Sequence, residues 1–100
     1  MKIFLSGPMT GIPEFNRPAF FEAEAALKAK GHQVWNPARL PDGLTHGLYI
    51  ALNLAAMNTE KWDILAQLEG WIWSTGACDE YLEARKLGVF DMPIDQVYDI

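Results

Sequence analysis

Three short apolar runs, each followed by a loop and then by a helical pattern, constrain the fold of this chain more than any other feature. The runs occupy Lys2–Ser6, Gln33–Trp35 and residues 62–68. Strands that alternate with helices predict a parallel sheet with right-handed crossovers. After Gly88 further apolar residues predict an edge strand, because Pro93 cannot donate a hydrogen bond within a sheet. We therefore expect an α/β fold with about four or five parallel strands flanked by helices.

The predicted helices begin at residues that commonly cap helix N-termini. Asn16 precedes a helix that we expect to end near Lys30, and Thr45 precedes a second helix at residues 46–58. A Ser-Thr-Gly turn precedes a third helix, which we expect at residues 76–87. The three helices would lie against the sheet through their apolar faces.

The composition excludes several classes of function. A net charge of −5 argues against binding a nucleic-acid polymer through its phosphates. No apolar run is long enough to span a membrane, and a signal peptide is not expected at the start of the chain. Cys78 is the only cysteine, which rules out an internal disulfide and fits a cytoplasmic location. The cysteine and the two histidines lack metal-ligand spacing, so we expect neither a metal nor another cofactor.

The length of the chain bears on its assembly. A chain of 100 residues predicts one domain, spanning residues 1–100, with a limited core. Four tryptophans in so short a chain cannot all be fully buried, and aromatic residues are enriched at interfaces. We therefore expect a homodimer.

Three loops rich in glycine, proline and short polar residues follow the predicted strands, at residues 6–13, 36–43 and 69–76. In open parallel sheets, ligands bind beyond the carboxyl ends of the strands, where such loops meet. Glycines in the first loop allow a ligand to approach the backbone closely. Their spacing fits neither a Walker A loop nor a dinucleotide fingerprint. The loops therefore predict a pocket for a small molecule of the nucleotide type.

Two polar helix residues are candidates for that pocket. Glu80 falls in the predicted first turn of the third helix and borders the apolar stripe formed by Ala77 and Ala84. It would either complement the helix dipole or act as a carboxylate that nearby backbone N–H groups keep ionised. Asn53 lies four residues after Tyr49 on the second helix. It would either face solvent or reach the same space as the strand ends.

Two tryptophans follow the third apolar run. Trp71 and Trp73 alternate across Ile72, so we expect them to share one face. Stacking on a nucleobase is one interpretation, and packing or a dimer contact is the favoured one.

Several motifs together carry a resemblance to known proteins. They are Ser-Gly-Pro-Met-Thr-Gly at residues 6–11, Asn-Pro at residues 36–37, and Gly-Trp followed by Ser-x-Gly-Ala-x-x-Glu at residues 70–80. Over nearly all of the chain up to Gly88, these motifs resemble a small family that is frequent in phages and prophages. That family is similar to the nucleoside 2-deoxyribosyltransferases and the deoxynucleoside-monophosphate N-glycosidases. The resemblance implies a Rossmann-like or flavodoxin-like three-layer fold that binds a nucleoside or nucleotide.

The resemblance also implies a reaction and a set of site residues. Glu80 matches the glutamate that attacks C1′ of a 2′-deoxynucleoside, as in a retaining glycosidase. Ser74 matches the serine that helps to hold a 5′-phosphate in the monophosphate-cleaving relatives. The first loop would line the sugar and base pocket. The residues expected to contact substrate are Ser6, Gly7, Pro8, Met9, Trp71, Ser74 and Gly76.

Two departures from the family pattern leave alternatives open. Phe4 stands where the related enzymes usually carry a tyrosine, and Asn53 stands where an aspartate is expected. An amide can hold a hydroxyl or a base edge, but it cannot donate a proton as a general acid. Asp63 opens the third strand and has a structural interpretation. The chain is therefore interpreted as an enzyme acting on the N-glycosidic bond, as a catalytically silent nucleotide-binding protein, or as a phage interaction protein with a vestigial pocket.

Overall fold

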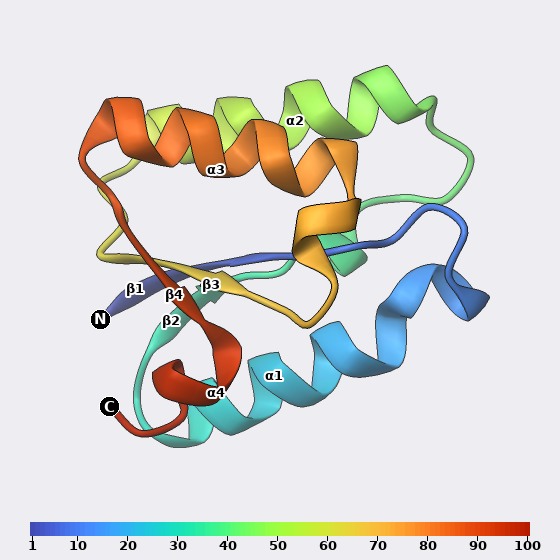
Figure 1. Ribbon diagram of the computed structural model, residues 1–100. Helices are drawn as coiled ribbons and strands as arrows, with labels where there is room; N and C mark the ends of the chain where they lie inside the picture. The colour runs from blue at the N-terminus through green and yellow to red at the C-terminus, as the bar shows by residue number, and fades with distance from the viewer.

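The computed structural model describes residues 1–100 as a parallel sheet between two layers of helices (Figure 1). The strands lie in the order β2-β1-β3-β4, and every pairing is parallel. This arrangement confirms the predicted α/β class with its Rossmann-like layering, and β4 takes the edge position predicted for the segment around Pro93. The strands are β1 (Lys2–Ser6), β2 (Gln33–Trp35), β3 (Ile64–Gln67) and β4 (Phe90–Pro93).

Helices cover both faces of the sheet (Figure 1). One face carries α1 (Arg17–Ala29) and the short α4 (Ile94–Val97), and the other carries α2 (His46–Thr59) and α3 (Thr75–Leu87). The first three helices begin and end close to the predicted residues. None of the helices combines the length and apolar character needed to cross a membrane. Three single 3-10 turns complete the loops: η1 (Pro13–Asn16), η2 (Pro37–Arg39) and η3 (Trp71–Trp73).

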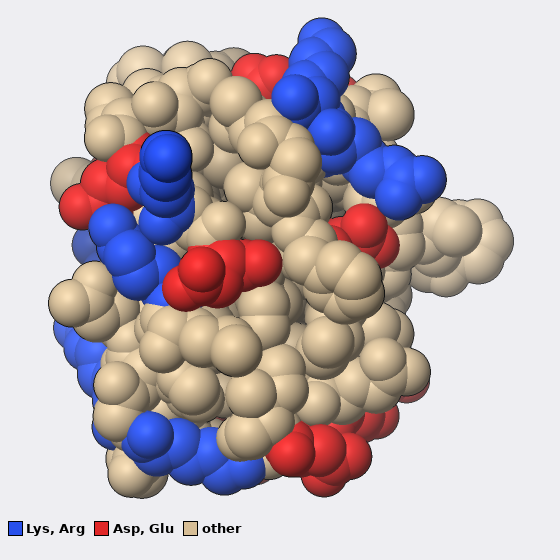
Figure 2. All heavy atoms as spheres, turned by 90° about the vertical axis from the view of Figure 1, so that its left-hand side faces the viewer, with Lys and Arg blue, Asp and Glu red and all other residues tan.

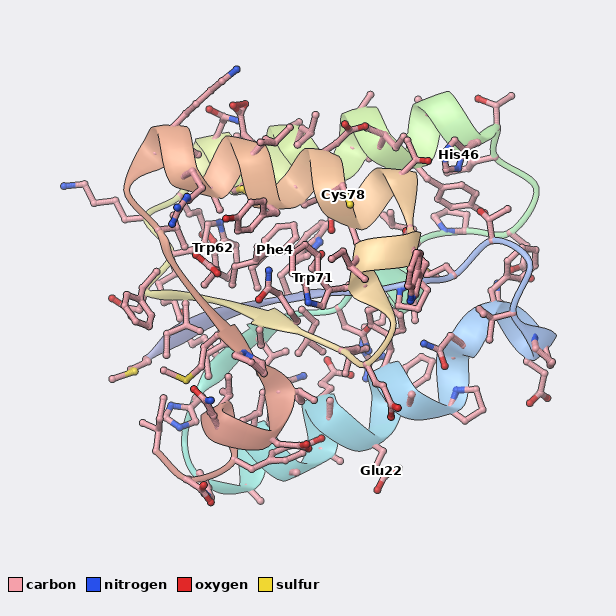
Figure 3. The ribbon with its side chains drawn as sticks, in the orientation of Figure 1. Phe4, Glu22, His46, Trp62, Trp71 and Cys78 are labelled. Atoms are coloured by element: carbon pink, nitrogen blue, oxygen red, sulfur yellow. The ribbon has the colours of Figure 1, made fainter.

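The central strand β1 supplies side chains to both layers of the core. Ile3 and Leu5 are fully buried among the residues of α1 and α4, because alternate side chains of a strand point to opposite faces. Phe4 points to the α2 and α3 side, where its ring stacks on Trp35 at 5.9 Å and meets the edge of Trp62 at 5.4 Å. Figure 3 shows Phe4 and Trp62 between the sheet and α3. Phe4 is therefore a core residue.

The helix caps are only partly those that the sequence predicts. The hydroxyls of Thr45 and Ser74 each accept a hydrogen bond from a backbone N–H three residues later, at 3.2 Å in both cases, which confirms both predictions. Asn16 occupies the N-cap position of α1 but does not cap the helix. Its backbone is left-handed (φ 60°), and its amide donates to the carbonyl of Pro8 at 3.0 Å.

The amino-terminal ends of the strands carry mixed charges (Figure 2). Asp63 accepts a hydrogen bond from the backbone N–H of Lys2 at 2.7 Å, which supports the predicted structural role of Asp63. The ammonium group of Lys2 pairs with Glu60 at 3.2 Å. These contacts tie the start of β1 to the segment before β3, and they leave the carboxyl-terminal ends of the strands for the pocket described next.

Candidate active site

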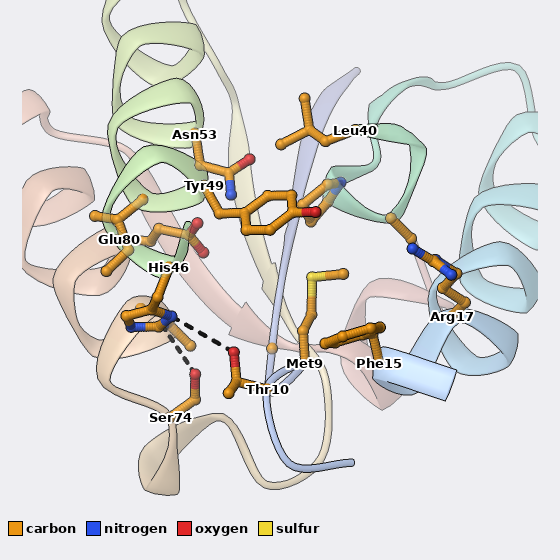
Figure 4. Close-up of a pocket in the computed structure, with 16 residues that line it drawn as sticks. Met9, Thr10, Phe15, Arg17, Leu40, His46, Tyr49, Asn53, Ser74 and Glu80 are labelled. Carbon is orange, nitrogen blue, oxygen red and sulfur yellow. Dashed lines mark hydrogen bonds between the residues drawn. The ribbon is translucent and has the colours of Figure 1, made fainter. Parts of the chain in front are cut away.

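The carboxyl ends of the strands border a pocket to which all three predicted loops contribute (Figure 4). Gly7 and Met9 come from the loop after β1, Ala38 and Leu40 from the loop after β2, and Ser74 from the loop after β3. Side chains from α2, α3 and the start of α1 complete the wall. The pocket therefore lies where ligands bind in open parallel sheets.

Glu80 lies on the wall of this pocket as a buried carboxylic acid. Only 5% of the residue is exposed, and the hydroxyl of Ser6 donates a hydrogen bond of 2.5 Å to Glu80 Oε1. The contact joins the end of β1 to α3. Because α3 begins at Thr75, Glu80 lies in its second turn and not in the first turn that the sequence pattern predicted. This position turns the side chain toward the sheet, beside the buried Ala77 and Ala84.

The environment of Glu80 favours its neutral form. Burial raises the pKa of Glu80 from 4.5 to about 7, although the hydrogen bond from Ser6 lowers it, and the charge of Asp79 raises it further. The expectation that backbone N–H groups keep Glu80 ionised is therefore wrong. The carboxyl sits one turn too far along the helix for the first-turn N–H groups to outweigh the loss of water. Near neutral pH both protonation states of Glu80 are populated.

Asn53 faces the pocket from α2 and is 6% exposed. Its Oδ1 accepts a hydrogen bond of 3.0 Å from the indole N–H of Trp35, on β2. In Figure 4 the amide nitrogen of Asn53 points toward the side of the pocket where Glu80 lies. An indole N–H can only donate, so the reverse orientation of the amide would leave that N–H unpaired, at a cost of about 1–3 kcal/mol.

The loop before α3 places two of the predicted phosphate contacts in the pocket. Ser74 accepts the cap hydrogen bond from the N–H of Ala77, and its own hydroxyl hydrogen remains free to donate to a ligand. Gly76 lines the same wall. The predicted placement of Ser74 and Gly76 beside Glu80 therefore agrees with the structure, whereas their contact with a phosphate remains a prediction.

Three residues predicted to contact substrate, Ser6, Pro8 and Trp71, lie outside the pocket lining. Ser6 is fully buried and donates its hydroxyl hydrogen to Glu80. The carbonyl of Pro8 accepts a hydrogen bond from Asn16, and the ring of Trp71 packs on Tyr81 at a centroid distance of 5.2 Å. Trp71 and Trp73 do not share a face, and Trp73 is 88% exposed. The reason is that η3 is a 3-10 turn, in which side chains two positions apart point in different directions. Figure 3 shows Trp71 beneath the first part of α3.

The end of η1 and the start of α1 supply pocket residues that the sequence did not reveal. Phe15 and Arg17 line the pocket because Glu14, Phe15 and Asn16 all have a left-handed backbone, with φ of 57°, 53° and 60°. Such a run is costly for residues other than glycine, and no sequence pattern signals it. The guanidinium of Arg17 lies over the Phe15 ring and pairs with Asp42 in the loop after β2.

The start of α2 supplies Tyr49 and His46, which also were not predicted as site residues. Tyr49 lies one turn before Asn53, so the i, i+4 spacing on one helix face could have revealed it. Its hydroxyl donates to the carbonyl of Pro41 at 2.6 Å. His46 lies at the mouth of the pocket, within 3.5 Å of the Thr10 hydroxyl (Figure 4).

An ion-pair cluster around the buried Glu24, with the exposed Arg39 and Lys28 as its partners, supports the wall that η2 forms. Glu24 of α1 is 3% exposed and accepts two hydrogen bonds from Arg39 Nε, at 2.8 and 2.9 Å. It also accepts one from Asn36, whose own oxygen caps η2 through the N–H of Ala38 at 2.9 Å. Hydrogen bonding to Arg39, and then to Lys28 and Asn36, lowers the pKa of Glu24 to about 2 despite its burial. The cluster therefore fixes the loop that follows β2.

Residues 1–91 match a family model described as "Domain of unknown function (DUF4406)". The chain belongs to this family. No curated protein and no solved structure matches the chain. The description of the DUF4406 family names no reaction and no ligand, so the resemblance to nucleoside deoxyribosyltransferases remains a prediction. The match runs from β1 to the start of β4 and therefore includes every residue that lines the pocket.

The pocket of this DUF4406 member contains a carboxyl group, an amide and a guanidinium among its polar groups. Glu80 is its one carboxyl group, Asn53 offers an uncharged amide, and Arg17 brings a permanent positive charge. No group of three or more His, Cys, Asp or Glu side chains is placed to hold a metal ion. A carboxylate held by a hydroxyl, next to hydrogen-bond donors, can attack an electrophilic carbon and stabilise the developing charges.

Proposed function

We propose that the protein cleaves or transfers at the N-glycosidic bond of a 2′-deoxynucleoside or its 5′-monophosphate, with Glu80 as the nucleophile. The observation that carries this proposal is the buried Glu80 carboxyl on the wall of a pocket at the carboxyl edge of a parallel sheet, held by the Ser6 hydroxyl at 2.5 Å. The resemblance of residues 74–80 to the Ser-x-Gly-x-x-x-Glu segment of the related enzymes supports the same assignment.

In the proposed reaction the ionised carboxylate of Glu80 attacks C1′ of the sugar. The bond from C1′ to the base nitrogen breaks, and its electron pair leaves with the base. Water or a second base then attacks C1′ and releases the carboxylate, as in a retaining glycosidase, and the proton that the attacking group loses balances the one that the departed base takes up from solvent. Ser6 donates to Oε1 of Glu80, which leaves Oε2 free to form the bond to the sugar. Because the pKa of Glu80 is about 7, a substantial fraction of the carboxyl is ionised near neutral pH and can act as the nucleophile.

A 5′-phosphate on the substrate is supported by the groups around Ser74. Ser74 and Gly76 lie at the N-terminus of α3, where the helix dipole and free N–H groups favour an anion. Arg17 and His46 line the same pocket. The resemblance of Ser74 to the phosphate-holding serine of the monophosphate-cleaving enzymes also supports a 5′-phosphate on the substrate.

The test is release of free base from a panel of 2′-deoxynucleosides and their 5′-monophosphates, followed by chromatography. Glu80→Gln should abolish release, because the neutral amide is a poor nucleophile while its oxygen still accepts the Ser6 hydrogen bond. Asp79→Asn is the matched control, since Asp79 is the adjacent acid on α3 and does not line the pocket. Release that persists in Glu80→Gln would overturn the proposed role of Glu80.

A catalytically silent nucleotide-binding protein is the second candidate function. It is favoured by Asn53, because the amide cannot protonate a leaving base and Glu80 is the only carboxyl group in the pocket. Saturable nucleotide binding without base release, measured by calorimetry, would select this function. Neither binding nor release would leave an interaction protein with a vestigial pocket.

We also propose that two copies of the chain associate through α2. This helix contains no Asp, Glu, Lys or Arg, and it exposes Leu48, Ala51, Leu52 and Ala55 along one face. A helix that is apolar all round is normally covered. The chain has a net charge of −5, so an uncharged face is the surface on which two copies meet without repulsion. Light scattering should show a dimer that Leu52→Glu dissociates and that Leu82→Glu, on the exposed side of α3, leaves intact.

A further inference from the structure

The orientation of the Asn53 amide is fixed by a residue outside the pocket. Trp35 does not line the pocket, yet its indole N–H donates to Asn53 Oδ1 at 3.0 Å. Because the indole has a donor and no acceptor, only the oxygen of the amide can face it. The ring of Trp35 is in turn held against the fully buried Phe4 by stacking. Trp35 is therefore held in place, and it holds the Asn53 amide in one orientation.

The other end of the amide is unused within the chain. Asn53 Oδ1 is the only atom of this side chain that forms a hydrogen bond, so the amide nitrogen has no protein partner. Asn53 is nevertheless 6% exposed, and its nitrogen points toward the Glu80 side of the pocket (Figure 4). This nitrogen is not among the fully buried atoms that lack a partner, so it is open to the pocket and available to donate to a ligand acceptor.

We propose that Asn53, with Trp35 as its positioning residue, selects nucleobases that carry a keto group over those that carry an amino group. This inference takes from the proposed function only that the ligand is a nucleoside or nucleotide. A sugar hydroxyl both donates and accepts, so a fixed amide cannot discriminate through it. A carbonyl oxygen of a base only accepts, and an exocyclic amino group donates. The N–H donor of the fixed Asn53 amide therefore suits a base carbonyl and is opposed by an exocyclic amino group.

Tyr49 adds a second group whose hydrogen-bonding role toward a ligand is fixed. The single hydrogen of its hydroxyl is donated to the Pro41 carbonyl at 2.6 Å, so toward a ligand this oxygen can only accept. A keto base presents an acceptor carbonyl next to a ring N–H donor, whereas the corresponding amino base presents a donor next to a bare ring nitrogen. The donor of Asn53 and the acceptor of Tyr49 both suit the keto pattern.

The test compares two ligand pairs that differ in the keto or amino character of the base. They are the 5′-monophosphates of deoxyuridine and deoxycytidine, and those of deoxyinosine and deoxyadenosine. Affinities are measured by calorimetry in the Glu80→Gln protein, so that the ligand is not consumed. We expect the keto member of each pair to bind about tenfold more tightly or better, the effect of one satisfied against one opposed hydrogen bond.

Two variants separate recognition from general damage to the fold. Asn53→Asp replaces the donor with an acceptor and should reverse the preference toward the amino bases. Trp35→Phe keeps an aromatic ring against Phe4 but frees the amide to rotate, and it should bring the keto-to-amino ratio close to unity. Asn58→Asp makes the same change on the exposed side of α2 and should leave the ratio unaltered.

The outcomes also separate this inference from the proposed function. Equal affinities within each pair, a ratio unchanged by Asn53→Asp, or no binding of any of the four nucleotides would overturn the inference. A keto preference that reverses in Asn53→Asp supports it, whether or not the Glu80 protein releases base. Base release is scored on the protein with Glu80 intact, so each proposal fails on its own measurement.

Discussion

The buried acid of Glu80 makes the stability of the protein depend on pH in a direction opposite to that of most carboxylates. Folding raises the pKa of Glu80 from 4.5 to about 7, chiefly by burial. At about 1.4 kcal/mol per pKa unit, this shift corresponds to roughly 3 kcal/mol of unfolding free energy. The folded state binds the proton more tightly than the unfolded state. This stabilisation is therefore complete below pH 4.5 and is lost as the pH rises through 7.

Glu80→Gln isolates that contribution. Glutamine has nearly the size of the protonated acid, keeps an oxygen for the Ser6 hydroxyl and cannot ionise. Denaturant unfolding of both proteins should give similar free energies near pH 4.5. By pH 8 the variant should be more stable than the wild-type protein by roughly 3 kcal/mol. Comparing the two proteins at each pH removes the titration of all other groups.

A companion variant is Asp79→Asn, which leaves Glu80 buried but removes the neighbouring charge that raises its pKa. It should show a smaller gain at pH 8 than Glu80→Gln, because burial is the larger cause of the shift. A difference between Glu80→Gln and wild type that stays constant within about 1 kcal/mol from pH 4.5 to 8 would refute the reasoning, because it would mean that Glu80 does not change its proton affinity on folding.

Three further predictions concern the surroundings of the site. Ser6→Ala removes the hydrogen bond that lowers the pKa of Glu80, so the pH at which base release reaches half its maximum should rise; an unchanged pH-rate profile would contradict this. Glu24→Gln should lower the free energy of unfolding by about 1–3 kcal/mol at pH 7. This difference from wild type should vanish as the pH falls from 4.5 toward 2, because ionised Glu24 stabilises the fold and becomes protonated over that range. Denaturant unfolding at pH 7 and near pH 2 tests it. Gly7→Ala should lower the free energy of unfolding by about 1–3 kcal/mol, since its Cβ would lie 2.7 Å from Leu68 Cβ; thermal melting that matches wild type would show that the loop yields.

The sequence predicted the layers of the fold because the signals for them are local. Short apolar runs with glycine and proline breaks mark the strands, and the hydroxyls of Thr45 and Ser74 mark two helix starts. The carboxyl-edge rule for parallel sheets then predicted which loops would meet. The exception is Asn16, whose left-handed backbone and bond to Pro8 depend on how the first loop folds back.

The chemistry of the site was less predictable because it depends on contacts that are distant in sequence. Glu80 borders the apolar stripe of α3, and the pattern alone did not decide whether it faces the sheet or solvent. Its pKa depends on burial and on Ser6, which is 74 residues away in the sequence. Likewise, the pattern around Asn53 permitted both a solvated and a pocket-facing side chain. Its contact with Trp35 decides between them and also fixes the direction of the amide.

The hydrogen bond between Ser6 and Glu80 closes a loop of 74 residues, which has a consequence for the order of folding. Strand β1 is synthesised first, yet both of its neighbours in the sheet come later, and parallel neighbours cannot form as simple hairpins. On the ribosome, β1 therefore stays unpaired until β2 has emerged, and it gains its second neighbour only after β3 has emerged. A sheet assembled from such non-local pairings folds slowly for its size, and the pocket is completed only once α3 has docked. If the chain needs a chaperone during synthesis, the segment that needs it is therefore β1, which is made well before Glu80, the residue that completes the site.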